Sequence, residues 1–121
     1  MKAMKAMKLV VVLMGVLCMA GALHAEPVQG SIYHPDTVLA GHSDTYTITL
    51  RAGETTRVRV SGDGDTDLDL YVYDENGNLI ASDTDYTDEC FVSVTPRWTG
   101  VFYVKIVNRG SVYNRYTLQV V

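Results

Sequence analysis

Short runs of alternating apolar and polar residues, separated by turn-forming residues, occupy most of the sequence after residue 43. Apolar residues take every second place in Tyr46–Leu50, Leu68–Val72, Phe102–Ile106 and Tyr116–Val120. A period of two is the period of a β-strand with one buried and one exposed face, whereas an amphipathic helix needs a period near 3.6. The sequence therefore predicts antiparallel strands that each contribute one side to a core.

Turn signals separate these runs at regular intervals, among them Gly62–Gly64, Pro96–Gly100 and Asn108–Ser111. The strongest is Asn76-Gly77, because a tight hairpin requires positive φ at both central positions and these residues tolerate it. About seven to eight short strands at spacings of roughly 8–12 residues are typical of a β-sandwich. We therefore predict an all-β fold with one antiparallel sandwich.

The first 25 residues differ from the rest of the chain. Met1–Lys8 is basic, and Leu9–Ala20 is an apolar run followed by small residues, which is the layout of a secretory signal peptide. A membrane span needs roughly 20 apolar residues, so this run is too short. We predict a signal peptide over residues 1–25, cleaved after Ala22 or Ala25, and a secreted or periplasmic protein with no membrane anchor after cleavage.

Cleavage leaves one cysteine. Cys18 lies in the predicted signal and is preceded by Leu17, where lipid attachment requires a small residue. Cys90 shares one side of its strand with Val92 and Val94, so we expect a buried core thiol that is not a nucleophile.

Charge and periodicity organise the remaining residues. The segment 26–43 has little periodicity and is predicted to be a leader, and residues 44–121 are predicted to form the sandwich. Three of the ten basic residues and none of the 14 acidic ones lie before residue 26, so the rest of the chain is strongly acidic. It lacks the positive field that attracts phosphate backbones, and nucleic acid is excluded as the expected partner.

Acidic residues cluster in two places. Asp63, Asp65 and Asp67 alternate like the first ligands of an EF-hand loop and form a candidate calcium site, although Leu68 replaces the glycine expected at the sixth position. Alternatively, these carboxylates are the solvated side of a turn and strand. No other cofactor is expected. The second acidic patch consists of Asp83, Asp85, Asp88 and Glu89.

Catalytic motifs are weak. Gly41–Thr45 lacks the second glycine of a nucleophile elbow, and His34 and His42 lack the spacing of a zinc site. We predict that the protein is not an enzyme, with a small secreted hydrolase that uses the aspartate cluster as the alternative.

The aromatic residues indicate binding. If Leu70 and Val72 face the core, the register places Tyr71 and Tyr73 on the exposed face, and the alternation in Phe102–Ile106 does the same for Tyr103. Exposed aromatic rings offer a large contact area to a sugar or an extended peptide at low entropic cost. Alternatively, the tyrosines form cross-strand pairs that only cover the sheet. The candidate ligand-binding residues are Tyr71, Tyr73, Tyr103 and the loop residue Trp98.

The same register places Asp67 and Asp69 on the exposed side of the strand that carries Tyr71 and Tyr73. If that strand and the strand of Tyr103 are neighbours, we expect an aromatic patch with an acidic rim. Such a patch suits a neutral or basic extended partner.

Several blocks together resemble the bacterial pre-peptidase C-terminal domain family. They are Gly41–Leu50, Ala52–Glu54, Asp67–Asp74 with Asn76-Gly77, Gly100–Ile106 and Tyr116–Leu118. The resemblance covers Gly41–Val121 and implies a jelly-roll-like β-sandwich of the kind that is usually appended to secreted peptidases. The clostridial collagenase relatives bind collagen through exposed aromatic residues.

The chain departs from the family pattern in two ways. We expect no catalytic domain before the module, and we therefore expect an exported peptidase as a partner in trans. Relatives that bind calcium carry an acidic, Asn-containing stretch before the first strand, whereas Ile32–Thr37 has a single acid. We expect a secreted, non-catalytic module that binds extracellular protein or polysaccharide; the alternative is a stand-alone structural module that assembles with another exported or envelope protein.

Overall fold

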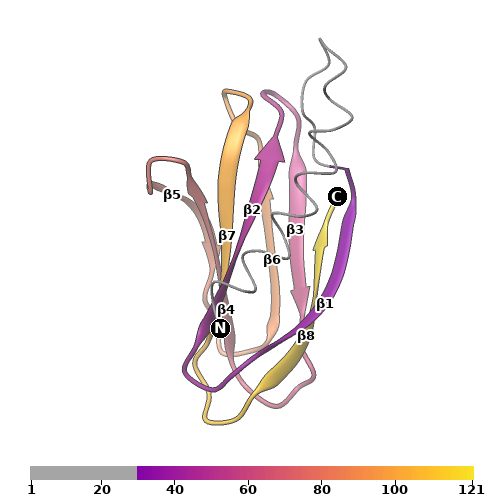
Figure 1. The fold of residues 1–121 in the computed structure, drawn as a ribbon, viewed down its shortest axis with the longest axis vertical. Coiled ribbons are helices and arrows are strands. Elements are labelled where there is room, and N and C mark those ends of the chain that lie inside the picture. Colours follow the sequence, from indigo (N-terminus) through magenta and orange to yellow (C-terminus); the bar gives the residue numbers. More distant parts are fainter. Residues whose placement is uncertain (1–29) are drawn as a thin grey trace.

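The structure, a computed structural model, describes residues 30–121, which form eight β-strands (Figure 1). Their bounds are β1 Ile32–Val38, β2 Ser43–Leu50, β3 Thr56–Ser61, β4 Leu68–Asp74, β5 Leu79–Asp83, β6 Glu89–Val94, β7 Gly100–Asn108 and β8 Asn114–Val120. In this part of the chain, no helix is long and apolar enough to cross a membrane. The predicted signal peptide and its cleavage sites lie outside the described residues.

The strands form two four-stranded antiparallel sheets. Sheet A has the order β1-β8-β3-β6 and sheet B the order β2-β7-β4-β5. Consecutive strands β1 to β4 alternate between the sheets, and so do β6, β7 and β8, which is the connectivity of a jelly roll. The prediction of an antiparallel, jelly-roll-like sandwich with seven to eight strands is confirmed.

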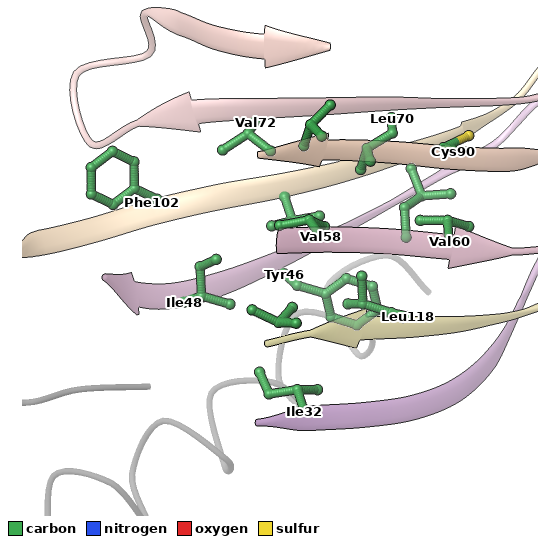
Figure 2. Close-up of a cluster of buried hydrophobic side chains, with 14 of the residues drawn as sticks. Ile32, Tyr46, Ile48, Val58, Val60, Leu70, Val72, Cys90, Phe102 and Leu118 are labelled. Atoms are coloured by element: carbon green, nitrogen blue, oxygen red, sulfur yellow. The ribbon is translucent and has the colours of Figure 1, made fainter. Parts of the chain in front are cut away.

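The core fills the space between the sheets, as the alternation predicted. Figure 2 shows Leu70 and Val72 from sheet B and Val58, Val60 and Leu118 from sheet A in one cluster of side chains. These five side chains are fully buried. Burial of an aliphatic side chain contributes about 1.5–3 kcal/mol, so this two-sided layer is the main source of stability.

The boundary predicted at residue 44 requires a correction, because the segment expected to be a leader contains β1. This strand pairs with β8 along its whole length, from Ile32 opposite Val120 to Val38 opposite Asn114. Its inward positions alternate as in the other strands, but two of them are the polar residues His34 and Asp36, so an apolar period was not visible. Asp36 joins a hydrogen-bond network in the core, as described below, and the His34 ring packs edge-on against that of Tyr46.

The predicted β4–β5 hairpin is present, with a longer loop than a two-residue turn. The Gly77 N–H donates to the carbonyl of Asp74, so Glu75 and Asn76 are the central residues, and Gly77 follows them with a φ of 86°. The buried carboxylate of Asp74 accepts hydrogen bonds from the N–H groups of Asn76 and Asn78 and from the Asn78 amide. These bonds stabilise the longer loop and lower the pKa of Asp74, the Asn78 side chain having the largest effect.

Candidate functional site

Three of the predicted ligand-binding residues lie together on the outer face of sheet B. Strands β4 and β7 are neighbours, Tyr73 lies directly opposite Tyr103, and Tyr71 lies opposite Lys105. The rings of Tyr71 and Tyr73 stack, with centroids 6.2 Å apart and an interplanar angle of 22°. All three tyrosines are half-buried. We call this surface, with Lys105 and Arg109, the tyrosine face.

Arg109 fixes one side of the tyrosine face. Its Nε donates to Asp69 Oδ2 over 2.7 Å, and its terminal nitrogen donates to the Tyr71 hydroxyl over 3.0 Å. The Asp69 carboxylate and the Tyr71 hydroxyl raise the pKa of Arg109, so the guanidinium stays charged. Only 5% of Asp69 is exposed. The tyrosine ring is therefore held by a charged group that is itself anchored.

The contact between Arg109 and Asp69 changes the charge predicted for the edge of this surface, which was expected to be acidic. Asp69 is on the predicted side of β4 but pairs with Arg109, and Asp67 is half-buried just before the strand. Lys105 and Arg109 add positive charge to this surface. The alternation of β7 places Lys105 beside Tyr103 and could have revealed it. Arg109 lies beyond the end of β7, where no periodicity indicates its direction.

A shallow groove of about 310 Å³ runs along the tyrosine face. It is lined by Tyr71 and Tyr73, by Lys105 and Arg109, and by Gly41–Ser43 at the start of β2, whereas Tyr103 lies outside it. Flat rings on one side and two cationic donors on another suit a ligand with both apolar surface and hydrogen-bond acceptors.

Trp98 does not join the tyrosines. It lies in the β6–β7 loop and stacks on the core residue Phe102, with ring centroids 5.6 Å apart. It lines a mainly apolar groove of about 300 Å³ together with Ile80 and Pro96. The indole therefore covers one end of the core, where a loop residue has no strand register to predict its direction.

The carboxylates of the predicted calcium site do not converge. Asp63 accepts hydrogen bonds from the N–H groups of Arg115 and Asp65, and the Arg115 bond is the main cause of its lowered pKa. Burial, followed by repulsion from Asp69, raises the pKa of Asp67. Among residues 30–121, no group of three His, Cys, Asp or Glu side chains could hold a metal ion. The expected ligand set of Asp63, Asp65 and Asp67 is not assembled.

The second acidic patch is used for local structure. Asp83 accepts from the Phe91 N–H, Asp85 accepts from the Thr87 N–H and hydroxyl, and Glu89 accepts from the Ser61 hydroxyl. The buried Asp88 accepts from the Gly64 N–H and from the Asn114 amide. Each carboxylate thus fixes a turn or joins two strands.

Cys90 is a core thiol, as predicted from its side of β6. It is 2% exposed, and its Sγ donates to the Leu68 carbonyl over 3.1 Å. Burial raises the pKa of the thiol to about 12. A thiol with this pKa is a poor nucleophile at neutral pH.

A buried hydrogen-bond network joins the two sheets and was missed from the sequence. Tyr116 of β8 donates to Asp44 Oδ2 of β2 over 2.6 Å, and its hydroxyl contacts that of Tyr46. Tyr46 donates to Asp36 Oδ2 of β1 over 2.8 Å. Desolvation by burial raises the pKa of both tyrosines. Asp44 continues the inward period of β2, but a carboxylate at that position resembles the start of a turn.

Comparison with solved structures finds the same fold in three other proteins. The pre-peptidase C-terminal domain of a collagenase from Bacillus anthracis is 17% identical and covers 75% of this chain and 89% of its own, with a TM-score of 0.60. Aeromonas hydrophila PliG, a periplasmic inhibitor of g-type lysozyme, is 16% identical with a TM-score of 0.58 and covers 74% of this chain and 83% of its own. The Yersinia pseudotuberculosis-derived mitogen is 12% identical with a TM-score of 0.54, and the match covers 75% of this chain and 84% of the mitogen. At these identities the likeness shows the fold alone.

Sequence comparison identifies the family. No curated protein sequence matches the chain significantly. The family model for the bacterial pre-peptidase C-terminal domain matches residues 42–107, from the start of β2 almost to the end of β7, which is more than half of the chain. The matched range contains all of sheet B except the last residue of β7, and every residue of the tyrosine face except Arg109. The chain belongs to the bacterial pre-peptidase C-terminal domain family.

Proposed function

We propose that this chain is an exported, non-catalytic binding module that holds an extracellular protein or polysaccharide at its tyrosine face. One observation carries the proposal: the register of β4 and β7 brings Tyr73 directly opposite Tyr103 and stacks Tyr71 beside Tyr73, next to two cationic side chains. Rings gathered in this way form a continuous contact surface.

The tyrosine face is ordered before a ligand arrives. Arg109 holds the Tyr71 hydroxyl and is held in turn by Asp69, so these side chains lose little rotamer freedom on binding. Tyrosine also has few rotatable bonds for its contact area. The groove therefore favours an extended ligand whose apolar surface packs on the rings and whose acceptors meet Lys105 and Arg109.

The family supports this assignment. Pre-peptidase C-terminal domains are accessory modules, and one solved relative in fold is the domain of a collagenase. Another protein of the same fold is a periplasmic lysozyme inhibitor, which acts on a protein. Export of this chain rests on the predicted signal peptide, and the strongly acidic charge of the rest of the chain argues against nucleic acid as the ligand.

The test is retention of the exported protein on insoluble fibrillar collagen, chitin, cellulose and peptidoglycan. The informative variants are Tyr71→Ala and Tyr103→Ala, each compared with Tyr86→Ala, because Tyr86 is 93% exposed in the β5–β6 loop. We expect loss of each tyrosine of the face to weaken binding by about 1–2 kcal/mol or more. Tyr86→Ala should bind like the wild type.

Two results would contradict the proposal. Variants of Tyr71 and Tyr103 that bind as tightly as Tyr86→Ala would show that the tyrosines only cover the sheet. Hydrolysis of ester, peptide or glycoside substrates by the purified protein would overturn the non-catalytic assignment.

A second function is favoured by the exposed apolar residues at the edge of sheet B. Leu79 and Ile80 of the edge strand β5 are 54% and 40% exposed, and Trp98 beside them is 41% exposed. Exposed apolar residues on an edge strand are typical of protein–protein contacts. This arrangement supports assembly with another exported or envelope protein, an exported peptidase included. An Ile80→Asp variant that loses a partner captured from the culture supernatant or envelope, while Tyr71→Ala retains it, would favour this function.

A further inference from the structure

Sheet A presents its own row of outward side chains, on the opposite side of the sandwich from the tyrosine face. Tyr33 lies opposite Gln119, Gln119 opposite Arg59, and Arg59 opposite Phe91, so the row crosses all four strands. Three strand spacings of about 4.8 Å separate its two aromatic ends by about 14 Å. Tyr33 is 72% exposed and Phe91 45% exposed.

Two arginines on the central strand β3 give this row its charge. The Arg59 guanidinium lies over the Phe91 ring, 5.9 Å from the centroid, and this contact holds it in place. Arg57 is exposed on the same face, about 6.7 Å along the strand. Within residues 30–121, neither arginine forms an ion pair. We call Tyr33, Gln119, Arg57, Arg59 and Phe91 the arginine face.

The neighbouring side chains extend this positive surface along β8. Arg115 lies on the same side of sheet A, with its guanidinium 5.6 Å from the centroid of the Tyr113 ring. Two acids near this surface accept hydrogen bonds, Glu89 from the Ser61 hydroxyl and Asp63 from two backbone N–H groups. Acidic residues outnumber basic ones in this chain, yet three exposed arginines lie on one face of sheet A. This face therefore carries a local excess of positive side chains.

We propose that the arginine face is a second binding surface, and that its ligand is a carboxylated polysaccharide. A guanidinium pairs with a carboxylate through two parallel N–H···O bonds, and stacking on Phe91 orients Arg59 for that contact. Gln119 supplies both a donor and an acceptor for sugar hydroxyls. The exposed Tyr33 ring offers a flat apolar surface against which a sugar ring packs.

The position of the face favours a polysaccharide over an acidic peptide. Strands β3 and β8 are central in sheet A, so their backbone groups are paired with neighbours on both sides. A peptide that binds by strand addition would pair with the edge strand β1 or β6, beside Arg57, Arg59 and Gln119 rather than across them. The shallow groove next to the row is lined by neither Tyr33 nor Phe91. Recognition here depends on side chains alone.

The experiment measures binding of the exported protein to soluble polygalacturonate, with dextran as the neutral polymer and poly-glutamate as the acidic peptide. Arg57→Ala/Arg59→Ala should weaken polygalacturonate binding about tenfold or more. Arg51→Ala/Arg97→Ala removes the same charge from two loops and should change the affinity less than about threefold. Arg57→Lys/Arg59→Lys keeps the charge but removes the planar guanidinium, so its affinity for polygalacturonate should lie between those of the two alanine variants.

Three outcomes would overturn this proposal: no polygalacturonate binding above that of dextran, equal losses for the two double alanine variants, or poly-glutamate binding as tight as that of polygalacturonate. The last outcome would assign the face to acidic peptides. Tyr71→Ala/Tyr103→Ala should keep full polygalacturonate affinity. The experiment therefore distinguishes failure of the proposal for the tyrosine face from failure of the proposal for the arginine face.

Discussion

The two outer faces of the sandwich use the same residue types in opposite ways. On sheet B, Arg109 is tied to the buried Asp69 and the tyrosines lie half-buried around it. On sheet A, Arg57 and Arg59 are exposed, and the guanidinium of Arg59 lies over the Phe91 ring. Alternation directs the tyrosines of sheet B and the arginines of sheet A outward. Arg109 lies beyond the end of β7 and is fixed instead by hydrogen bonds to Asp69 and Tyr71.

This difference separates stability from binding. A residue tied to a buried charge contributes to folding, because its removal leaves that charge without a partner. An exposed arginine on a sheet face has little effect on folding. The tyrosine face is therefore expected to be partly structural, and the arginine face free to act on a ligand alone.

The largest contrast concerns neighbouring residues on opposite sides of sheet A. Cys90 faces the core and Phe91 faces solvent. At pH 8 the native Cys90 thiol, with its pKa of about 12, should react with iodoacetamide about a thousandfold or more slowly than in urea, because access requires unfolding. A cysteine placed by Phe91→Cys in a Cys90→Ala background should react rapidly in the native protein. Rapid native labelling of Cys90 would contradict the assigned sides of β6.

The next contrast compares the two sides of β4. Leu70 is fully buried, so Leu70→Ala should lower the free energy of unfolding by about 2–5 kcal/mol in urea titrations. Tyr71→Ala removes a half-buried ring on the other side and should cost about 1 kcal/mol or less. Equal losses would mean that the tyrosine face is as structural as the core.

A smaller effect tests the role of the two kinds of arginine. Arg109→Ala leaves the 5%-exposed Asp69 without its ion-pair partner and should lower the melting temperature clearly. Arg59→Ala on sheet A should leave the melting temperature close to the wild type, within about 0.5 kcal/mol of stability. Thermal unfolding of both variants in one buffer measures the difference. If the two melting temperatures match, Arg109 is as free as Arg59, and the comparison between the faces fails.

The smallest effect depends on pH and concerns the turn at the end of β4, next to Tyr73. The pKa of Asp74 is lowered by hydrogen bonds from Asn78 and the turn, so the ionised form is favoured in the folded state. Its contribution is present above the unfolded value of about 3.9 and is lost as the pH falls through the lower folded value. Asp74→Asn should therefore melt below the wild type at pH 7, and the gap should close towards pH 2. A gap that is constant with pH would exclude this charge effect.

The sequence was sufficient for the parts of the fold in which apolar residues repeat every second position. It predicted the inward sides of β4, β7 and β8 and the outward direction of Tyr71, Tyr73 and Tyr103. It missed β1, because two of its inward positions hold the polar residues His34 and Asp36. Asp36 accepts a hydrogen bond from Tyr46, and the His34 ring packs edge-on against the Tyr46 ring. Such bonds join residues that are distant in sequence and leave no periodic signal.

The candidate site, like the fold, could be predicted only in part from the sequence. Alternation gave the direction of each tyrosine, but the adjacency of β4 and β7 follows from the order of the strands, which no local pattern contains. Trp98 and Arg109 lie outside strands, so their directions depend on Phe102 and on Asp69. The prediction of an acidic rim was wrong because Arg109, which neutralises Asp69, is distant from it in the chain.

The most direct test of the tyrosine face is the affinity of three proteins for the same insoluble material that retains the wild type. They are the wild type, Tyr71→Ala/Tyr103→Ala and Arg57→Ala/Arg59→Ala, compared at equal amounts of folded protein. The tyrosine variant should bind at least about tenfold more weakly, and the arginine variant should bind like the wild type. Equal binding by the tyrosine variant and the wild type would contradict the assignment of the tyrosine face as the ligand site.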